Sequence, residues 1–183
     1  MKRTAIGLIE LSSIATGFVV ADVLLKAAAV ELLINRTICS GKYLIVIGGE
    51  VAAVEASLAA GVGSGGGAVI DSALIPNIDP AVFPALSGTV ILESYGALGV
   101  IESFSVTSLI EGADAAVKAA PVQLLEIRMA MALGGKAFVK LTGEVAAVQA
   151  AIDAGAAPIA RRGLLVNKVV IPAPSRALFG DSI

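Results

Sequence analysis

Residues 5–28 read AIGLIELSSIATGFVVADVLLKAA, and residues 97–120 read ALGVIESFSVTSLIEGADAAVKAA. The second stretch repeats the first 92 positions further along the chain, since 97 − 5 = 92. Over the longer pair Ala5–Arg36 and Ala97–Arg128, 14 of 32 aligned positions are identical. Such self-similarity indicates a duplicated folding unit, and it decides the fold.

The duplication continues toward the end of each copy. After a shift of two more positions, Gly41–Gly61 matches Gly135–Gly155 with 11 identities in 21 positions. Alanine richness raises such counts, but the matched Gly, Glu, Asp and Lys positions do not depend on it. Chance similarity in a biased sequence is therefore a poor explanation.

Within the first copy, local patterns predict a strand and then a helix. Ala5–Glu10 is a short apolar run typical of a strand. Ser12 and Ser13 are suited to cap a helix that follows. The apolar residues at helical spacing predict its inward face. That expected face consists of Ile14, Phe18, Ala21, Leu25 and Ala28.

The remainder of the copy predicts two strands, a helix and a last strand. Glu31–Thr37 and Tyr43–Ile47 are the expected strands. Glu50–Ala60 is the expected second helix, with Val51, Val54 and Leu58 inward and Gly61 as its end, and Ala68–Ile75 is the last strand. The order β-α-β-β-α-β is the ferredoxin-like pattern of an α+β domain.

The second copy repeats this order from Ala97 to Ile171, and residues 77–95, with two prolines, connect the two. We therefore expect a first domain at 1–94, including the connector, and a second at 95–183.

Composition excludes several chemistries. The chain has no His and one Cys. Without His, a Ser-His-Asp triad, a Cys-His dyad and a His-based zinc site are excluded. One Cys excludes a disulfide within the chain and a cysteine-ligated cluster held by one chain alone. Because no nucleophile–base pair is evident, we expect no catalytic residues and no enzyme.

Charge and hydropathy point to an oligomer. The net charge is −2, which argues against a nucleic-acid partner. The longest uncharged stretch, Ala56–Ile70, is too short and too rich in Gly to span a bilayer, so we expect no membrane partner and a soluble, cytoplasmic protein. Hydrophobic residues make up 57% and charged residues 15% of the chain. This is more apolar surface than one small chain can bury, which favours association with other copies.

The paired motifs resemble a known family. AIGLIE and ALGVIE, the helix ending AD-x-x-x-K-A-A, the GK before a strand and the G-E-V helix start are together similar to the bacterial microcompartment shell proteins. Two domains in tandem resemble the class in which three chains make a pseudo-hexameric tile. The string TICSGK, residues 37–42, is most similar to the propanediol-utilisation type trimer that carries an iron–sulfur cluster. That type has Pro where this chain has Ser40, a departure expected to be mild for backbone geometry.

The resemblance implies roles for two loops. In this family the loop between the second and third strands surrounds a central pore. The implied pore residues are Ile38, Cys39, Ser40, Gly41, Met131, Ala132, Leu133 and Gly134. On a three-fold axis, three copies of Cys39 would supply thiolates for one [4Fe–4S] cluster per trimer and for electron transfer across the shell. The alternative is a small apolar Cys in a cluster-free metabolite pore.

The resemblance also implies edge residues. Lys26 and Lys118 each follow an aspartate, Asp22 or Asp114, by one helical turn. They fit an i,i+4 ion pair on a solvated helix face. They equally fit edge lysines that pack against neighbouring shell proteins in a microcompartment in the cytoplasm.

One other class of protein remains open. Ferredoxin-like domains also occur in ligand-binding regulatory proteins, which would form small oligomers without sheets.

The glycines at 61–67 lack the GK[ST] ending of a phosphate-binding loop, so they are expected to form a turn before the last strand. The matched acids Glu10 and Glu102 are interpreted as structural.

Overall fold

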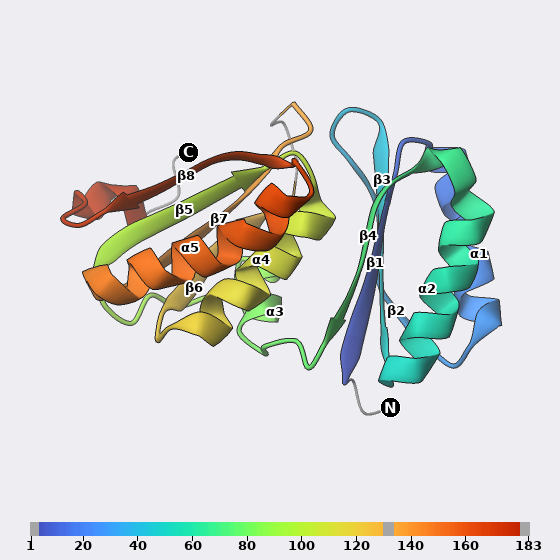
Figure 1. Ribbon diagram of the computed structural model, residues 1–183, viewed down its shortest axis with the longest axis horizontal. Helices are drawn as coiled ribbons and strands as arrows, with labels where there is room; N and C mark the ends of the chain where they lie inside the picture. The colour runs from blue at the N-terminus through green and yellow to red at the C-terminus, as the bar shows by residue number, and fades with distance from the viewer. Residues whose placement is uncertain (1–3, 130–133, 180–183) are drawn as a thin grey trace. The chain divides into compact units, whose positions relative to one another are not determined.

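The computed structural model describes residues 4–129 and 134–179, and each repeat forms a four-stranded antiparallel sheet with two helices (Figure 1). The first repeat contains β1 (Ala5–Leu11), α1 (Ile14–Ala27), β2 (Glu31–Ile38), β3 (Lys42–Gly49), α2 (Val51–Gly65) and β4 (Val69–Pro76). Its strand order is β2-β3-β1-β4. This confirms the predicted α+β domain with β-α-β-β-α-β order.

The second repeat has the same topology, with strand order β6-β7-β5-β8. Its elements are β5 (Ala97–Ser103), α4 (Val106–Ala119), β6 (Gln123–Arg128), β7 (Ala137–Gly143), α5 (Val145–Arg161) and β8 (Leu165–Ile171). The connector holds the short helix α3 (Val82–Ser87), and 3₁₀ turns lie at Gly66–Ala68 and Arg176–Phe179.

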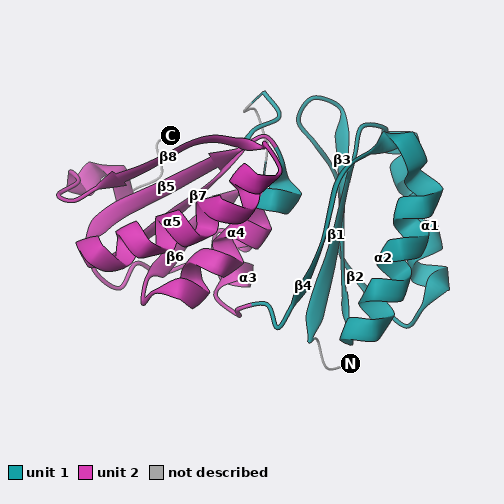
Figure 2. Cartoon of the chain, viewed as in Figure 1, with its two compact units in different colours: residues 1–78, 105–108, 129–136 teal, residues 79–104, 109–128, 137–183 magenta. Residues whose placement is uncertain are grey.

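The chain divides into two compact units (Figure 2). Unit 1 comprises residues 1–78, 105–108 and 129–136, and unit 2 comprises residues 79–104, 109–128 and 137–183. Residues 79–95 of the connector therefore group with unit 2. The first turn of α4 and the turn before β7 group with unit 1.

In unit 1, α1 and α2 cover one face of the sheet (Figure 1). Ile9 of β1, Ile45 of β3, Leu24 of α1 and Val54 of α2 belong to one buried cluster. Ser57 adds a buried bond between the helices, its hydroxyl donating to the Leu24 carbonyl at 2.9 Å.

The predicted inward face of α1 is largely wrong. The buried residues are Gly17, Val20, Ala21 and Leu24. The expected Ile14, Phe18 and Leu25 are 40%, 60% and 42% exposed, and Ala28 lies partly buried after the helix. The helix is apolar on two sides, so its period fits two faces. Gly17 decides between them, because only a residue without a Cβ fits against the Tyr43 ring.

The predicted end of α2 is also wrong. The helix runs on through Gly61 to Gly65, and Gly66, with φ +48°, follows it. A Cβ at Gly61 would lie 2.6 Å from Leu24 Cδ2, so this glycine permits close packing instead of ending the helix. The residues from 61 to 65, expected as a turn, are helical. Val51, expected inward, is 37% exposed at the first turn.

Candidate functional site

The loop predicted to line the pore and to hold an iron–sulfur cluster is the tight turn between β2 and β3. Ile38 pairs with Lys42, and Cys39, Ser40 and Gly41 form the turn. Ile38 is buried, Cys39 is partly buried, and Ser40 and Gly41 are exposed. The turn is closed by two left-handed residues in a row, with φ +65° at Ser40 and +71° at Gly41.

The backbone at Ser40 corrects one expectation. Proline fixes φ near −65°, so it cannot adopt the observed +65°. A proline in place of Ser40 would therefore change the backbone conformation of this turn, so the difference is not mild. A chain with Pro at this position needs a different backbone path through the loop.

The structure brings Gly135, the residue that follows the second predicted pore segment, beside the first segment. Gly134 and Gly135 are left-handed, with φ +60° and +84°. A Cβ at Gly135 would lie 3.0 Å from Ser40 Oγ and 3.9 Å from Lys42 Cε, all within unit 1. The predicted pore residues Met131, Ala132 and Leu133 lie outside the described residues.

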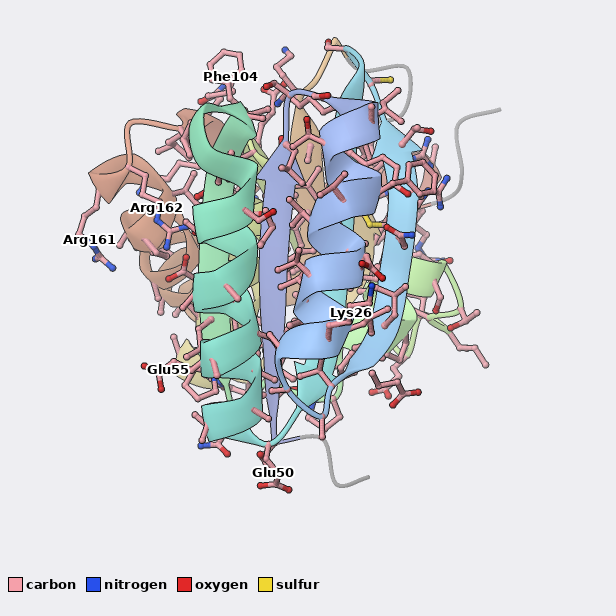
Figure 3. The ribbon with its side chains drawn as sticks, turned by 90° about the vertical axis from the view of Figure 1, so that its right-hand side faces the viewer. Lys26, Glu50, Glu55, Phe104, Arg161 and Arg162 are labelled. Carbon is pink, nitrogen blue, oxygen red and sulfur yellow. The ribbon has the colours of Figure 1, made fainter. Side chains whose placement is uncertain are left out.

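Lys26 and Lys118, the predicted edge lysines, make the predicted i,i+4 ion pairs. Lys26 Nζ lies 2.5 Å from Asp22 Oδ2, with side chains 74% and 59% exposed. Lys118 Nζ lies 2.6 Å from Asp114 Oδ2, with side chains 40% and 8% exposed. In Figure 3, Lys26 projects from α1 and Glu55 from α2, on the helical side of the first sheet.

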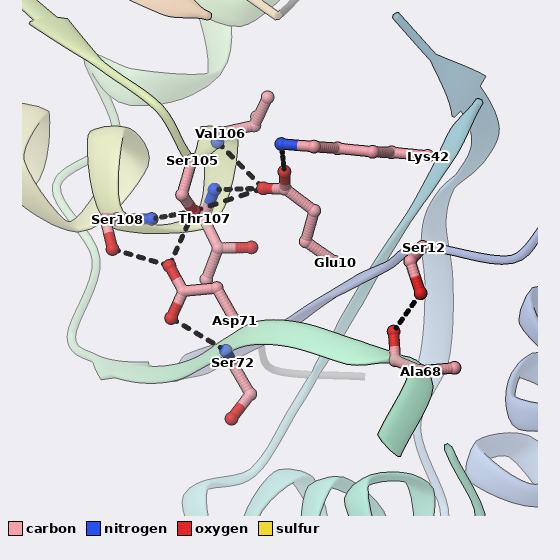
Figure 4. Close-up of polar contacts among 10 residues, drawn as sticks. All are labelled: Glu10, Ser12, Lys42, Ala68, Asp71, Ser72, Ser105, Val106, Thr107 and Ser108. Atoms are coloured by element: carbon pink, nitrogen blue, oxygen red, sulfur yellow. Dashed lines mark hydrogen bonds and ion pairs between the residues drawn. The ribbon is translucent and has the colours of Figure 1, made fainter. Parts of the chain in front are cut away.

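A buried polar cluster in unit 1 joins β1 and β4 to the first turn of α4 (Figure 4). Glu10 is fully buried, and its Oε1 accepts from Lys42 Nζ at 2.8 Å. Its Oε2 accepts from the Val106 backbone N–H at 2.8 Å. A carboxylate at a helix N-terminus satisfies backbone N–H groups that have no partner inside the helix.

Asp71 lies opposite Glu10 in the sheet and completes this cluster. Its Oδ2 lies 2.5 Å from the hydroxyls of both Ser105 and Ser108. Ser105 Oγ also accepts from the Ser108 backbone N–H at 3.1 Å, as an N-cap side chain does. The cluster therefore anchors the start of α4 to the first sheet.

Sequence reasoning named Glu10 and missed the rest of this cluster. Asp71, Lys42 and Ser105 are distant in the chain, and only strand register brings Asp71 opposite Glu10. The repeat held one signal, because Ser105 matches the predicted cap Ser13, 92 positions earlier.

A second charged group lies on β6 and β7 of unit 2. Glu126 pairs with Arg128 at 2.5 Å and with Lys140 at 2.7 Å. Burial raises the pKa of Glu126, but the hydrogen bonds from Lys140 and Arg128 outweigh it and hold the pKa below its usual value. Arg128 also lies over the Phe138 ring, at 5.8 Å from its centroid.

Neither a metal site nor a membrane segment is found in residues 4–129 and 134–179. No three His, Cys, Asp or Glu side chains there lie close enough to hold a metal ion. No helix in the same ranges has the length and hydropathy needed to cross a bilayer.

The comparisons with known proteins agree with the fold and the repeat. The BMC domain model matches the chain twice, at residues 5–78 and 97–174. The chain thus belongs to the bacterial microcompartment shell proteins and carries two BMC domains in tandem, as the sequence motifs predicted.

Three relatives illustrate this membership. The chain is 41% identical over 179 residues to the microcompartment shell protein PduT of Citrobacter freundii, covering 98% of this chain and 97% of PduT. It is 47% identical over 78 residues to the shell protein EutM of Salmonella typhimurium, covering 43% of this chain and 79% of EutM. A microcompartment protein of Desulfitobacterium hafniense, solved as a crystal structure, matches with a TM-score of 0.83 and 48% identity over 95% of this chain and 97% of that one.

Proposed function

We propose that this chain is a structural tile of a bacterial microcompartment shell, built from three copies that form a pseudo-hexameric trimer. The observation that carries the proposal is the twofold match to the BMC domain, with the same sheet order in both repeats. Three tandem chains place six similar domains around one axis, and closed rings are the common form of soluble oligomers.

The trimer is tested by native mass spectrometry and light scattering of purified protein. A closed trimer as the main species supports the tile. A dominant monomer at micromolar concentration contradicts it. Dimers or tetramers that bind a small molecule and never form sheets favour instead the ligand-binding regulatory protein.

The proposed pore lies at the β2–β3 turn and at the matching turn of the second repeat. Gly135 directly follows the second predicted pore segment, and its proximity to Ser40 supports this assignment, because it brings that segment near the first. The exposed turn residues Ser40 and Gly41 are suited to line an opening. Met131, Ala132, Leu133 and Gly134 are proposed to line the remainder.

The finer proposal places one [4Fe–4S] cluster on the trimer axis, for electron transfer across the shell. Cys39 lies at the tip of a hairpin, which three chains could bring together at an axis. One Cys per chain then becomes three thiolate ligands, enough for three of the four irons. Such a cluster, when bound, would supply one-electron chemistry, and Cys39 would hold it.

The test is reconstitution with iron and sulfide without oxygen. We expect brown protein that absorbs near roughly 400 nm and holds about one cluster per trimer. Cys39→Ser should abolish the colour and leave the trimer intact. A colourless wild-type trimer without iron would instead indicate a cluster-free metabolite pore.

Lys26 and Lys118 are proposed as contacts to neighbouring tiles. Lys26 is well exposed, and its partner Asp22 is exposed as well, so both can meet another protein. Lys26→Glu with Lys118→Glu should abolish sheets or tubes in electron microscopy while the trimer persists. Unchanged sheets would assign both lysines to an ordinary solvated face.

A further inference from the structure

A cavity of about 280 Å³ lies in unit 2, against strands β6 and β7. Its lining comes from three parts of that unit, which are the segment after α3, the two strands and the 3₁₀ turn at Arg176–Phe179. Ligand sites in proteins combine apolar walls with a few convergent polar groups. This cavity has both, since its lining includes Glu126, Arg128, Lys140, Leu92, Leu125 and Phe179.

Strand register assembles the charged group on one side of this cavity. Glu126 lies directly opposite Lys140 in the β6–β7 ladder. Lys140 alternates along β7 with the buried Val139 and Leu141, so it points to the other face of the sheet from these two. The carboxylate of Glu126 contacts both Lys140 and Arg128. The three charged groups therefore gather on one face of the sheet, at the cavity.

The first repeat indicates that the fold does not need this ion pair. Ile34 and Val46 lie opposite each other in the β2–β3 ladder. They match Glu126 and Lys140, which follow 92 and 94 positions later. The same cross-strand pair is thus apolar in one repeat and charged in the other. Because charges lose hydration when they are partly buried and apolar residues do not, the charged pair indicates a role other than folding.

Both cations have more donors than Glu126 uses. Glu126 Oε2 accepts from Lys140 Nζ at 2.7 Å, and its Oε1 accepts from Arg128 Nε at 2.6 Å and Nη2 at 2.5 Å. An ammonium has three N–H donors and a guanidinium has five, so most of them are not used by Glu126. Two cations and one carboxylate also leave the cavity with a net positive charge. The group is therefore suited to bind a further anionic acceptor.

The apolar walls of the cavity are held by contacts of their own. The Gln123 side chain bonds to the backbone on both sides of Leu92. Its Nε2 donates to the carbonyl of the residue before Leu92 at 2.7 Å, and its Oε1 accepts from the N–H of the residue after it at 3.1 Å. Phe179 packs edge-on against the Tyr95 ring, with centroids 5.1 Å apart. Walls fixed in this way lower the entropic cost of binding a ligand.

We propose that this cavity binds a small carboxylate that carries a short apolar chain. The carboxylate accepts charge-assisted hydrogen bonds from Arg128 and Lys140. The chain packs against Leu92, Leu125 and Phe179. Pockets for drug-sized ligands range from about 300 to 1,000 Å³, so this cavity suits a ligand of only a few non-hydrogen atoms. A phosphate fits less well, because its other oxygens would lose water against apolar side chains.

Ligand-observed NMR with butyrate tests the site. We expect saturable binding of butyrate and none of butylammonium, which has the same chain and the opposite charge. Lys140→Val introduces the residue that the first repeat has at the matched place, and it should weaken butyrate binding about tenfold or more. Lys168→Val is the matched control. Lys168 pairs with Asp153 in the same unit and does not line the cavity, so this variant should bind butyrate as the wild type does.

Glu126→Gln should have the opposite effect and tighten butyrate binding several-fold, because it removes the carboxylate that competes for both cations. Circular dichroism checks that each variant is folded. A folded wild type that does not bind butyrate overturns the site, as do equal binding of butylammonium, equal losses in the two lysine variants, or a Glu126→Gln chain that binds no tighter.

The site lies within one unit of the chain, so it goes beyond the tile and does not depend on the trimer. Native mass spectrometry of the same samples separates the two proposals. A trimer that does not bind butyrate overturns the site and leaves the tile standing. A monomer that binds butyrate supports the site and overturns the tile.

Discussion

The Ser105 hydroxyl lies 2.5 Å from Asp71 Oδ2, so the N-cap of α4 is hydrogen-bonded to a strand of the first sheet. The same hydroxyl caps the helix by accepting from Ser108 N–H. Ser105 therefore caps the helix and also ties its first turn to a strand of the first sheet. Among the residues that the structure describes, Asp71 and its neighbour Glu10 are buried carboxylates, as is Asp114.

Glu10→Gln should destabilise the fold by roughly 2–3 kcal/mol, because Lys42 would lose its buried carboxylate partner and the Val106 N–H a charged acceptor. Urea unfolding followed by circular dichroism measures this. Glu55→Gln, an exposed change on α2, is the matched control and should stay within about 0.5 kcal/mol of wild type. Equal midpoints for the two variants would mean that the cluster contributes little.

Two glycines of α2 should respond in opposite ways to alanine. Gly61→Ala places a Cβ 2.6 Å from Leu24 Cδ2 and should cost about 1–3 kcal/mol by overpacking. Gly63→Ala meets nothing within 4 Å and should gain about 0.5–1 kcal/mol, because alanine loses less backbone entropy in a helix. Thermal unfolding compares them. A stabilising Gly61→Ala would contradict the close contact between α1 and α2.

The left-handed φ of Ser40 predicts that glycine and proline at this position have different effects on stability. Ser40→Gly should leave the melting temperature unchanged or slightly raised, because glycine adopts a φ of +65° without strain. Ser40→Pro should lower the stability by more than about 1 kcal/mol, since proline cannot adopt this φ. If both variants melt together, the turn has an alternative backbone path of similar energy.

The Glu126 group predicts a stability difference that depends on pH. Its pKa in the folded chain is lowered, so ionised Glu126 stabilises the fold above its ordinary pKa, and this contribution disappears as the pH falls through the lowered value. Glu126→Gln should therefore cost on the order of 1 kcal/mol at pH 7. The cost should vanish in acid, where Glu126 is protonated. Denaturant midpoints measured from pH 7 to about pH 3 check this, and a difference that does not change with pH would contradict the ion pairs.

Local signals in the sequence were sufficient for the order of the elements. The repeat gave two domains, because a duplicated pattern folds twice in the same way. Ser13 was identified as a helix cap because capping depends on residues three positions apart, and the structure confirms its bond from Thr16. The ion pair between Lys26 and Asp22 was also predicted from local spacing, because residues four positions apart lie on the same face of a helix.

Only the tertiary structure decided which sides of these elements are covered. The period of α1 fits two apolar faces, and the contact of Gly17 with Tyr43 selects one of them. Gly61 is a helix breaker by local rules, yet it lies inside α2 because close packing against Leu24 outweighs its entropic cost. Glu10 meets Asp71 through strand register, which no local pattern encodes. The sequence by itself determined the two repeats and their elements, since those depend on neighbouring residues. The packed faces and the buried cluster depend on residues far apart in the chain, and therefore only folding brings them together.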